Sequence, residues 1–291
     1  MTPRQQLRAR LAGDALIVAP GIYDAYGARF VQQAGFDACY MTGNGVSASL
    51  LGRPDVGLVD LTLITQHAQR VAACIDLPLI CDADTGYGNV VNVRRTVQEF
   101  ETAGVAAIHL EDQVSPKRCG HLPGARPVIE LGEAVSKIEA AVAARRDPDF
   151  IIIARTDADG GHGLDEAIRR GKAFRKAGAD VLFAEIKSGP AMVENLRRFA
   201  GETAAPCLVN VTMGSPVEKV PAADLAQWGF RIAIHAGLAR NAAGFAIREA
   251  LDVLKRTGGT HTLAGLMLTG DDYNAVLGIA DVEAWEKQYL R

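Results

Sequence analysis

Residues 77–112 read LPLICDADTGYGNVVNVRRTVQEFETAGVAAIHLED and contain one complete strand–helix–strand unit. Largely apolar runs from Leu77 to Asp84 and from Ala106 to Asp112 predict two buried strands. Between them, Asn89 to Ala103 predicts a helix, because apolar side chains recur there at helical spacing. Gly104 stands where a left-handed glycine would close that helix. Two buried strands joined by a helix favour a parallel sheet.

The same alternation of a short apolar run and a longer amphipathic stretch recurs along the 291 residues. A helix over Leu131–Ala144, with Gly178 closing a later one, belongs to this pattern. Eight parallel strands indicate an α/β fold, a closed (β/α)8 TIM barrel, and the chain length suits it. No linker rich in Pro, Gly or Ser divides the chain, so we predict a single domain over residues 1–291. The predicted strands are Ala15–Ala19, Ala38–Thr42, Leu77–Asp84, Ala106–Asp112, Phe150–Asp157, Val181–Glu185, Cys207–Val211 and Arg231–His235.

Residues 257–291 extend beyond the eighth predicted helix. Gly258 and Gly259 form a break, and Asp281–Tyr289 predicts a short amphipathic helix with Val282, Trp285 and Tyr289 on one face. An appended helix with an apolar face needs a surface to cover it. That surface is either the chain's own barrel or a neighbouring subunit.

Composition excludes several functional classes. The formal net charge is −3, and Lys and Arg are scattered, so no basic face for nucleic acid or anionic membranes is expected. No window approaches the roughly 18 uninterrupted apolar residues of a membrane span. Five cysteines at irregular spacing fit neither a disulfide framework nor a zinc motif, which indicates a reducing, cytoplasmic compartment. Chemistry on a small molecule is the expectation.

Acidic side chains stand at the predicted strand ends. Asp82 and Asp84 alternate and so point to one face, while Glu111 and Glu185 end two other strands. Hard oxygen ligands without His or Cys spacing indicate Mg²⁺, with Mn²⁺ possible. The alternative is that the aspartates cap the next helix and bind lysines. Arg155, after an apolar strand, is interpreted as a clamp for a substrate carboxylate or as an ion-pair partner of these acids.

Other polar residues form weaker candidates for the site. The turn Tyr40-Met-Thr42-Gly43-Asn44 could hold a carboxylate with a phenol and backbone N–H groups, or be only a turn. His109, inside a strand, and His235, at a strand end, are each interpreted as a core or a site residue. His67 and His162 are predicted to face solvent.

The cluster Lys117-Arg118-Cys119-Gly120-His121 follows the acidic strand end Glu111-Asp112. A cysteine beside cationic side chains sits in a positive field that favours thiolate, so Cys119 is predicted to be reactive. The other four cysteines lie in or beside apolar runs and are predicted to act as small core residues, namely Cys39, Cys74, Cys81 and Cys207.

Together these motifs resemble the isocitrate lyase and phosphoenolpyruvate mutase superfamily over nearly the whole chain. The resemblance implies a (β/α)8 barrel with its last helix swapped between subunits, and a homotetramer built as a dimer of dimers. It also implies a Mg²⁺ site near Asp55, Asp82, Asp84 and Glu111. The motifs are Tyr40-x-Thr42-Gly43, residues 51–55 (LGRPD), residues 82–88 (DADTGYG), residues 111–113 (EDQ), residues 117–121 (KRCGH) and residues 154–157 (ARTD).

The Cys-Gly-His loop looks like that of the carbon–carbon lyase branch, which includes 2-methylisocitrate lyase, dimethylmalate lyase and petal death protein. The implied reaction cleaves a 2-hydroxy di- or tricarboxylic acid to a 2-oxo acid and a carboxylic acid. Tyr40 would take part as the base, Mg²⁺ would hold the oxo acid, and Cys119 would protonate the leaving carbanion. The implied catalytic residues are Cys119, Tyr40, His121, Arg155 and Glu185. The implied substrate ligands are Tyr40, Thr42, Gly43, Asn44, Asp82, Arg155, Asn210 and His235.

One segment departs from the lyase pattern. Residues 210–216 read NVTMGSP, whereas lyases of this branch show an Asn-Met-x-Glu-like stretch there. The alternatives are an oxaloacetate decarboxylase or hydrolase, or a carboxyphosphonoenolpyruvate phosphonomutase, because one barrel supports many chemistries. A barrel that binds a metal–carboxylate complex without turnover is the third.

Overall fold

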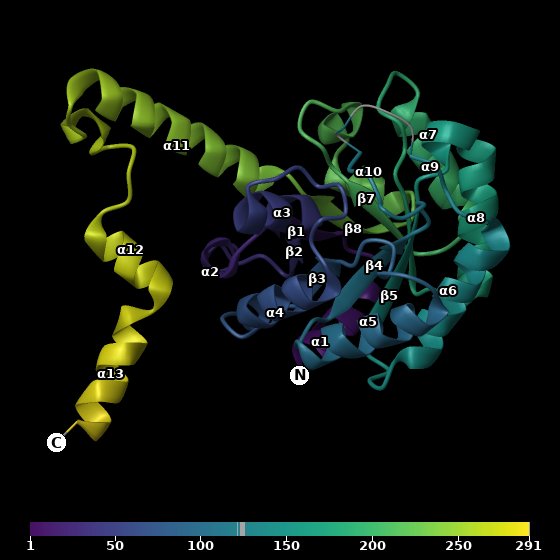
Figure 1. Cartoon of the computed structure of the whole chain (residues 1–291), viewed down its shortest axis with the longest axis horizontal. Coiled ribbons are helices and arrows are strands. Elements are labelled where there is room, and N and C mark those ends of the chain that lie inside the picture. The colour runs from purple at the N-terminus through teal and green to yellow at the C-terminus, as the bar shows by residue number, and fades with distance from the viewer. Residues whose placement is uncertain (121, 123–125, 291) are drawn as a thin grey trace.

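A computed structural model describes residues 1–120, 122 and 126–290 as a closed barrel of eight parallel strands, paired in chain order (Figure 1). The predicted barrel is thereby confirmed. All eight predicted strands form, most within two residues of their expected bounds. The strands are β1 Ile17–Ile22, β2 Cys39–Met41, β3 Leu79–Asp82, β4 Ala107–Glu111, β5 Ile151–Thr156, β6 Val181–Ala184, β7 Cys207–Asn210 and β8 Phe230–His235.

Helices alternate with the strands and most of them cover the outside of the barrel, whereas the last three extend away from it (Figure 1). They are α1 Pro3–Leu11, α2 Ala25–Gln33, α3 Gly43–Leu51, α4 Leu61–Ala72, α5 Val90–Thr102, α6 Leu131–Ala144, α7 Asp159–His162, α8 Leu164–Lys176, α9 Met192–Thr203, α10 Ala222–Gln227, α11 Leu238–Thr257, α12 Gly270–Leu277 and α13 Ile279–Tyr289. Two 3-10 turns, η1 Pro216–Lys219 and η2 His261–Leu263, complete the set.

Local signals explain where α5 begins and ends. Asn89 Oδ1 accepts from the N–H of Val91 at 2.9 Å, and Asn92 Oδ1 accepts from the N–H of Asn89 at 3.1 Å. Such reciprocal caps satisfy the first N–H groups of a helix, which have no partner within it. Gly104 takes the predicted left-handed conformation, with φ of 83°. Because α5 begins only at Val90, the acidic turn that follows β3 stays at the barrel mouth.

The first strand runs three residues beyond the predicted Ala19. Pro20 suggested an end because it cannot donate to a ladder. In the parallel register Pro20 nevertheless pairs with His235 of β8, and the strand continues through Gly21 to Ile22. A side chain on Gly21 would lie 2.5 Å from the carbonyl oxygens of His235 and Ala236. The absent side chain therefore lets β8 close against β1.

The core forms two apolar layers. Inside the barrel, side chains from all eight strands meet, among them Ile80, Ile153 and Phe183. Between barrel and helices lies a larger layer that includes Phe100, Phe174 and Phe199. Burial of this kind is the main stabilising contribution to the fold, at about 25 cal/mol per Å² of apolar surface.

Several predictions about histidines and cysteines meet the structure here. His67 is buried, with 8% of its surface exposed, and its Nε2 lies 2.7 Å from the Tyr23 carbonyl oxygen, so the predicted solvent-facing position is wrong. From α4, the His67 ring gives the carbonyl of Tyr23, just before α2, a polar partner inside the helix layer. His162 is exposed as predicted. Three cysteines are buried as predicted, Cys39, Cys81 and Cys207, and Cys74 is half-buried.

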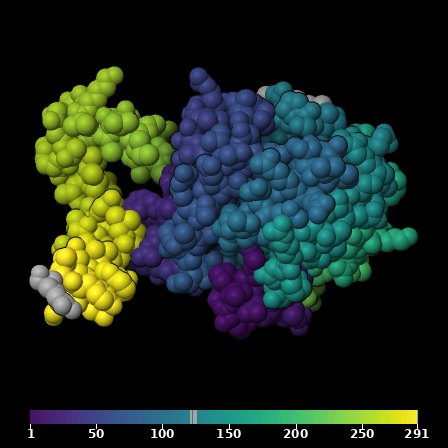
Figure 2. Space-filling model, turned by 60° about the horizontal axis from the view of Figure 1, so that its bottom comes forward, coloured from purple at the N-terminus to yellow at the C-terminus, as the bar shows by residue number. Residues whose placement is uncertain are grey.

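Residues 238–290, which we call the C-terminal arm, leave the barrel as the long helix α11 and then turn back along its side (Figures 1 and 2). The arm contains α12, which the sequence analysis missed, as well as the expected helix near residues 281–289. Arg29 of α2 donates to the carbonyl of Val276 at 3.0 Å, and Tyr26 packs on Tyr273. Among the described residues, no helix is long and apolar enough to cross a membrane.

The closure at Gly21 leads to a stability prediction. We expect Gly21→Ala to lower the free energy of unfolding by at least about 2 kcal/mol, because the new methyl meets backbone atoms that cannot move aside. Gly132→Ala is the matched control, since nothing lies within 4 Å of its added Cβ and helix propensity favours alanine. Urea unfolding followed by circular dichroism measures both. Equal stability of the two variants would contradict the closure argument.

Candidate active site

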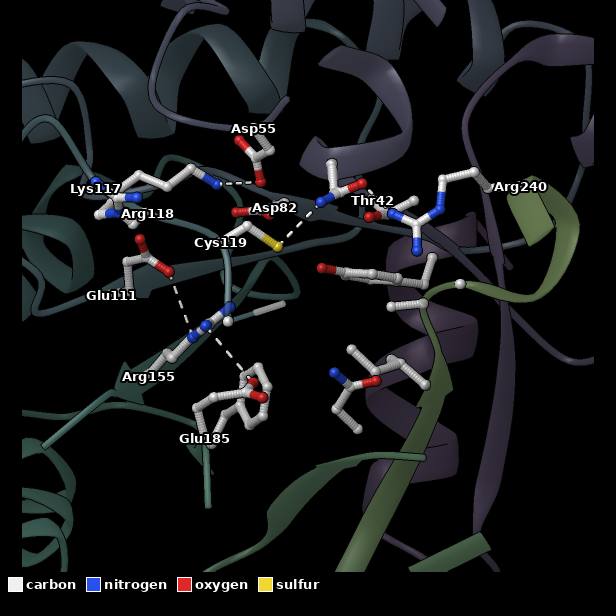
Figure 3. Close-up of a pocket in the computed structure, with 18 residues that line it drawn as sticks. Thr42, Asp55, Asp82, Glu111, Lys117, Arg118, Cys119, Arg155, Glu185 and Arg240 are labelled. Carbon is white, nitrogen blue, oxygen red and sulfur yellow. Dashed lines mark hydrogen bonds and ion pairs between the residues drawn. The ribbon is translucent and has the colours of Figure 1, made fainter. Parts of the chain in front are cut away.

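A cavity opens at the carboxyl ends of the strands, where barrel enzymes place their chemistry. Polar side chains from several strands and from the loop after β4 converge on it (Figure 3). The residues lining it are Tyr40, Thr42, Asn44, Asp55, Asp82, Glu111, Lys117, Arg118, Cys119, Gly120, Arg155, Phe183, Glu185, Asn210, Ile234, Ala236, Gly237 and Arg240.

The turn after β3 carries two of the acids in a constrained backbone. Asp84 has φ of 47°, a left-handed backbone conformation that residues other than glycine rarely adopt. Its N–H donates to Asp82 Oδ1 at 3.0 Å, which fixes the Asp82 carboxylate. A side chain on Gly43 would stand 2.7 Å from Asp82 Oδ2, so glycine keeps the space beside this oxygen clear. Backbone strain of this kind recurs at functional sites.

Lys117 lies buried between two carboxylates. Its Nζ donates to Asp55 Oδ2 at 2.7 Å and lies 2.8 Å from Asp84 Oδ1. Burial raises the pKa of Asp84 to about 7, and the neighbouring carboxylates add to the effect while Lys117 opposes it. Burial also raises the pKa of Asp55. Burial alone would lower the pKa of Lys117, but the surrounding acids hold it well above its usual value, so the ammonium stays charged.

Asp82 and Tyr40 both adjoin His109 beneath the cavity. Tyr40 Oη lies 2.8 Å from His109 Nε2, and Asp82 Oδ1 lies 3.7 Å from His109 Nδ1. Burial lowers the pKa of His109 to about 4, so the ring is neutral near pH 7. Burial likewise raises the pKa of Tyr40 well above its usual value, so the phenol keeps its proton. His109 is fully buried and does not line the cavity, as the core interpretation expects, and it also contacts the site residues Tyr40 and Asp82.

Arg155 faces several acids at once. Its Nε donates to Asp157 Oδ2 at 2.9 Å and lies 3.3 Å from Glu111 Oε2, while its Nη2 lies 3.5 Å from Glu185 Oε2. The guanidinium also lies over the Phe183 ring at 5.0 Å, a cation–π contact. Both predicted roles of Arg155 remain open, because it is ion-paired and also lines the cavity.

Glu111 keeps one oxygen without a partner. Burial raises the pKa of Glu111 well above its usual value, and Arg155 only partly offsets this. Its Oε1 is buried and has no hydrogen-bond partner among the described residues. An unsatisfied buried oxygen is costly and calls for an explanation, such as a bound ion or water.

Arg170 supports the site from behind. Its Nη1 donates to buried Asp112 at 3.0 Å, and the other oxygen of that carboxylate accepts the N–H of Asp157 at 2.9 Å. Thr156 Oγ1 also donates to Asp112 at 2.7 Å. Asp157 in turn holds Arg155, so the chain of contacts reaches from α8 to the cavity.

Cys119 reaches the cavity from the loop after β4. Its N–H donates to the carbonyl of Asp55 at 3.2 Å, which ties the loop to the acids. Asn44 Nδ2 donates to Cys119 Sγ at 3.0 Å, and Arg240 of α11 donates to Asn44 Oδ1 (Figure 3). His121, the other predicted catalytic residue of this loop, lies outside the described residues.

The donor set suits Mg²⁺ at part of the predicted site. The described residues contain no group of three or more His, Cys, Asp or Glu side chains arranged around one point. Lys117 pairs with Asp55 and Asp84, and of these two only Asp55 lines the cavity, together with Asp82 and Glu111. Mg²⁺ commonly takes only one or two protein carboxylates and keeps its waters. The free Glu111 oxygen and the Asp82 carboxylate therefore fit this ion.

Most residues predicted from the sequence meet in the one cavity, and three stand apart. Asn210 lines it, with its Oδ1 buried and unpartnered among the described residues. Gly43 and Asp84 lie behind the cavity. Gly43 leaves space beside the Asp82 carboxylate, and Asp84 forms an ion pair with Lys117. His235 is half-buried in a neighbouring pocket that also includes Met213 and Phe245.

Sequence reasoning missed two cations with clear roles. Lys117 belonged to the recognised loop, but its spacing gave no sign that it would enter the acid cluster 62 residues away from its Asp55 partner. Arg240 carried no motif signal at all, and it reaches the cavity only because α11 starts at the end of β8. Both depend on contacts between distant segments.

This fold and site define a (β/α)8-barrel enzyme with an acid-rich mouth. Residues 7–254 match the family model described as phosphoenolpyruvate phosphomutase. The chain belongs to the isocitrate lyase and phosphoenolpyruvate mutase superfamily, as the motifs predicted. The relatives include carbon–carbon lyases and hydrolases.

Three relatives illustrate the range. The 2,3-dimethylmalate lyase of Eubacterium barkeri is 40% identical over 289 residues, which cover 99% of this chain and 99% of that protein. The structure of oxaloacetate acetylhydrolase in complex with the inhibitor 3,3-difluorooxalacetate has a TM-score of 0.91 and 37% identity, covering 99% of this chain and 97% of that one. Phosphonopyruvate hydrolase in complex with oxalate and Mg²⁺ has a TM-score of 0.89 and 31% identity, with full coverage of both chains (100% and 100%).

The support from α8 is testable with two adjacent arginines. We expect Arg170→Met to cost about 3 kcal/mol of stability, because it leaves the Asp112 carboxylate buried without its cation. Arg169→Met should change stability little, since Arg169 is exposed and pairs with the same Glu166. Thermal and urea unfolding of the two variants give the comparison. A loss of equal size in both would mean that Glu166, and not Asp112, accounts for it.

Proposed function

We propose that this protein is a Mg²⁺-dependent carbon–carbon lyase that cleaves a 2-hydroxy di- or tricarboxylic acid to a 2-oxo acid and a carboxylic acid. The observation that carries the proposal is the entry of Cys119 Sγ into the same cavity as Asp82 and Glu111. A thiol that faces a carboxylate-lined cation site can deliver a proton to a carbanion formed beside that cation. The 40% identity with a dimethylmalate lyase agrees with this chemistry.

Asp82 and Glu111 would hold Mg²⁺, with Asp55 and Asp84 kept in place beside them by Lys117. The bound ion would supply Lewis-acid stabilisation of the developing 2-oxo acid. Tyr40 keeps its proton at neutral pH and is bonded to His109, so its phenol would receive the hydroxyl proton of the substrate while passing its own to His109 Nε2. Phe183 and Ile234 cover the remaining cavity wall.

The proton balance closes without another reactant. The substrate O–H bond and the C–C bond break, the C–C electron pair goes to the leaving carbon, and the Cys119 S–H proton forms the new C–H bond. The O–H electron pair becomes the second bond of the new C=O group, and the proton passed to His109 would return through Tyr40 to the Cys119 thiolate. No electrons are gained or lost, so neither an oxidant nor a reductant is needed.

The start of α3 supplies the substrate-carboxylate site in this proposal. Thr42 precedes the helix and makes no side-chain cap there, which leaves the first backbone N–H groups, including those of Gly43 and Asn44, for another acceptor. A helix amino terminus attracts anions through these groups and the helix dipole. Arg155 and Asn210 would complete the set from the opposite wall, with Glu185 orienting the arginine.

A second candidate is hydrolysis or decarboxylation of oxaloacetate, with phosphonomutase chemistry as a further variant. The turn at residues 210–216 favours it, because Met213 stands where the lyase pattern has a glutamate. The similarity to oxaloacetate acetylhydrolase also bears on it. Product analysis separates the two. The lyase turns a 2-hydroxy acid into a 2-oxo acid and a carboxylic acid, whereas oxaloacetate gives oxalate and acetate on hydrolysis or pyruvate and CO2 on decarboxylation.

We also propose a helix-swapped homotetramer in which the C-terminal arm packs on a neighbouring subunit. No residue of α11 is buried, and Phe245 and Leu251 are each about 60% exposed. Beside α11, an apolar groove runs along α2 and includes Phe30 and Phe36. A second copy related by symmetry would cover both surfaces at once.

Cleavage assays test the function. Wild-type protein with Mg²⁺ should convert at least one acid in a panel of 2,3-dimethylmalate, 2-methylisocitrate and oxaloacetate, and EDTA should abolish turnover reversibly. Cys119→Ser should lower kcat by at least about 100-fold, because it removes the proton donor. Cys74→Ser, a half-buried cysteine outside the cavity, is the control. Full activity in Cys119→Ser would refute the assigned role.

Light scattering after size exclusion tests the assembly. We expect wild-type protein to run as a tetramer and the double variant Phe245→Asp, Leu251→Asp to run as smaller species, because charges would enter an apolar interface. Val91→Asp, on exposed α5 surface, should leave the mass unchanged. A monomeric wild-type protein would refute the proposed assembly.

A further inference from the structure

Three segments far apart in the sequence meet at one side-chain amide. Asn44 stands in the first turn of α3, Arg240 in the first turn of α11, and Cys119 in the loop after β4. Asn44 Nδ2 donates to Cys119 Sγ at 3.0 Å, and Arg240 Nη1 donates to Asn44 Oδ1. All three residues line the cavity (Figure 3).

The arginine decides which way the amide points. A guanidinium has only donors, so the oxygen of Asn44 must face Arg240. The amide nitrogen then faces Cys119, and an amide nitrogen can only donate. Cys119 Sγ is therefore held as an acceptor, and a thiolate accepts more strongly than a thiol.

We propose that Asn44 and Arg240 are a positioning pair for Cys119. They fix its sulfur over the cavity and stabilise the thiolate that remains when the thiol has delivered its proton. This role rests on the proposed lyase function for its effect on turnover. The hydrogen bond strengthens as charge develops on sulfur, which is the property that lowers a barrier and does not merely improve binding.

Two of the cations near Cys119 are bonded to acids, and Asn44 is a neutral donor to its sulfur. The Lys117 ammonium is bonded to Asp55 and Asp84, and Arg155 is ion-paired with Asp157. The main chain of Cys119 is held separately, by its N–H bond to Asp55. The titratable or charged groups facing the cavity with Cys119 are Tyr40, Asp55, Asp82, Glu111, Lys117, Arg118, Arg155, Glu185 and Arg240.

The pair also changes the interpretation of Asn44. The sequence analysis named Asn44 as a substrate ligand in a turn that offers backbone N–H groups, and both polar ends of its side-chain amide are engaged by protein groups. Its backbone N–H remains for a substrate carboxylate. Because Arg240 belongs to α11, the pair also links the C-terminal arm to the reactive sulfur.

Two variants of the full-length protein separate the two bonds. Asn44→Ala removes both, whereas Asn44→Asp keeps the acceptor for Arg240 and removes the donor to sulfur in an isosteric side chain. For each, iodoacetamide alkylation of Cys119 at fixed pH is followed by peptide mass spectrometry. We expect alkylation to slow about threefold to tenfold, because losing one hydrogen bond to sulfur destabilises the thiolate by about that factor. Alkylation of Cys74 in the same samples is the internal control, and Arg197→Gln, an exposed residue of α9, is the control variant.

Kinetics on whichever acid is cleaved give the second measurement. A positioning pair predicts a fall in kcat with KM within about twofold, and Arg240→Met should shift both readouts in the same direction. A raised KM with unchanged kcat and unchanged alkylation would make Asn44 a substrate ligand and overturn the proposal. If the variants are alkylated more slowly but the wild-type protein cleaves none of the acids, the positioning role of Asn44 and Arg240 is supported. The proposed lyase function is then refuted.

Discussion

The crowding of buried carboxylates at the barrel mouth is the constraint that organises this structure. Asp55, Asp82, Asp84 and Glu111 come from different parts of the chain into a small, poorly hydrated volume. Like charges brought together out of water repel, and each loses its hydration. Lys117 neutralises part of that charge at hydrogen-bond distance, and the remaining carboxylate oxygens form a natural site for a divalent cation.

Many features elsewhere in the molecule serve this cluster. The left-handed backbone of Asp84 turns the chain so that its N–H fixes Asp82, and the missing side chain of Gly43 leaves room beside that carboxylate. On the far wall, Arg155 is held by Asp157. The loop that supplies Lys117 also supplies Cys119, so neutralising the acids and placing the thiol over them are one structural event.

Prediction from the sequence succeeded where the signal is local. Strand β4 and helix α5 follow from apolar periodicity and a closing glycine, and the acids at the strand ends follow from the rule that parallel strands end at one edge. It failed where a contact spans the chain. His67 looked like a surface residue because its partner, the Tyr23 carbonyl, lies 44 residues away. Arg240 had no motif and acquires its place from the direction in which α11 leaves β8.

The sequence by itself therefore determined the barrel, the positions of the acids and the presence of a cysteine beside cations, because periodicity and residue chemistry are written in short stretches. Only the tertiary structure decided that Lys117 forms ion pairs with two of the four predicted metal ligands, and that Asn44 turns its amide nitrogen toward Cys119. Those outcomes depend on distances between segments more than 30 residues apart in the chain, and such distances are set by how the whole barrel closes.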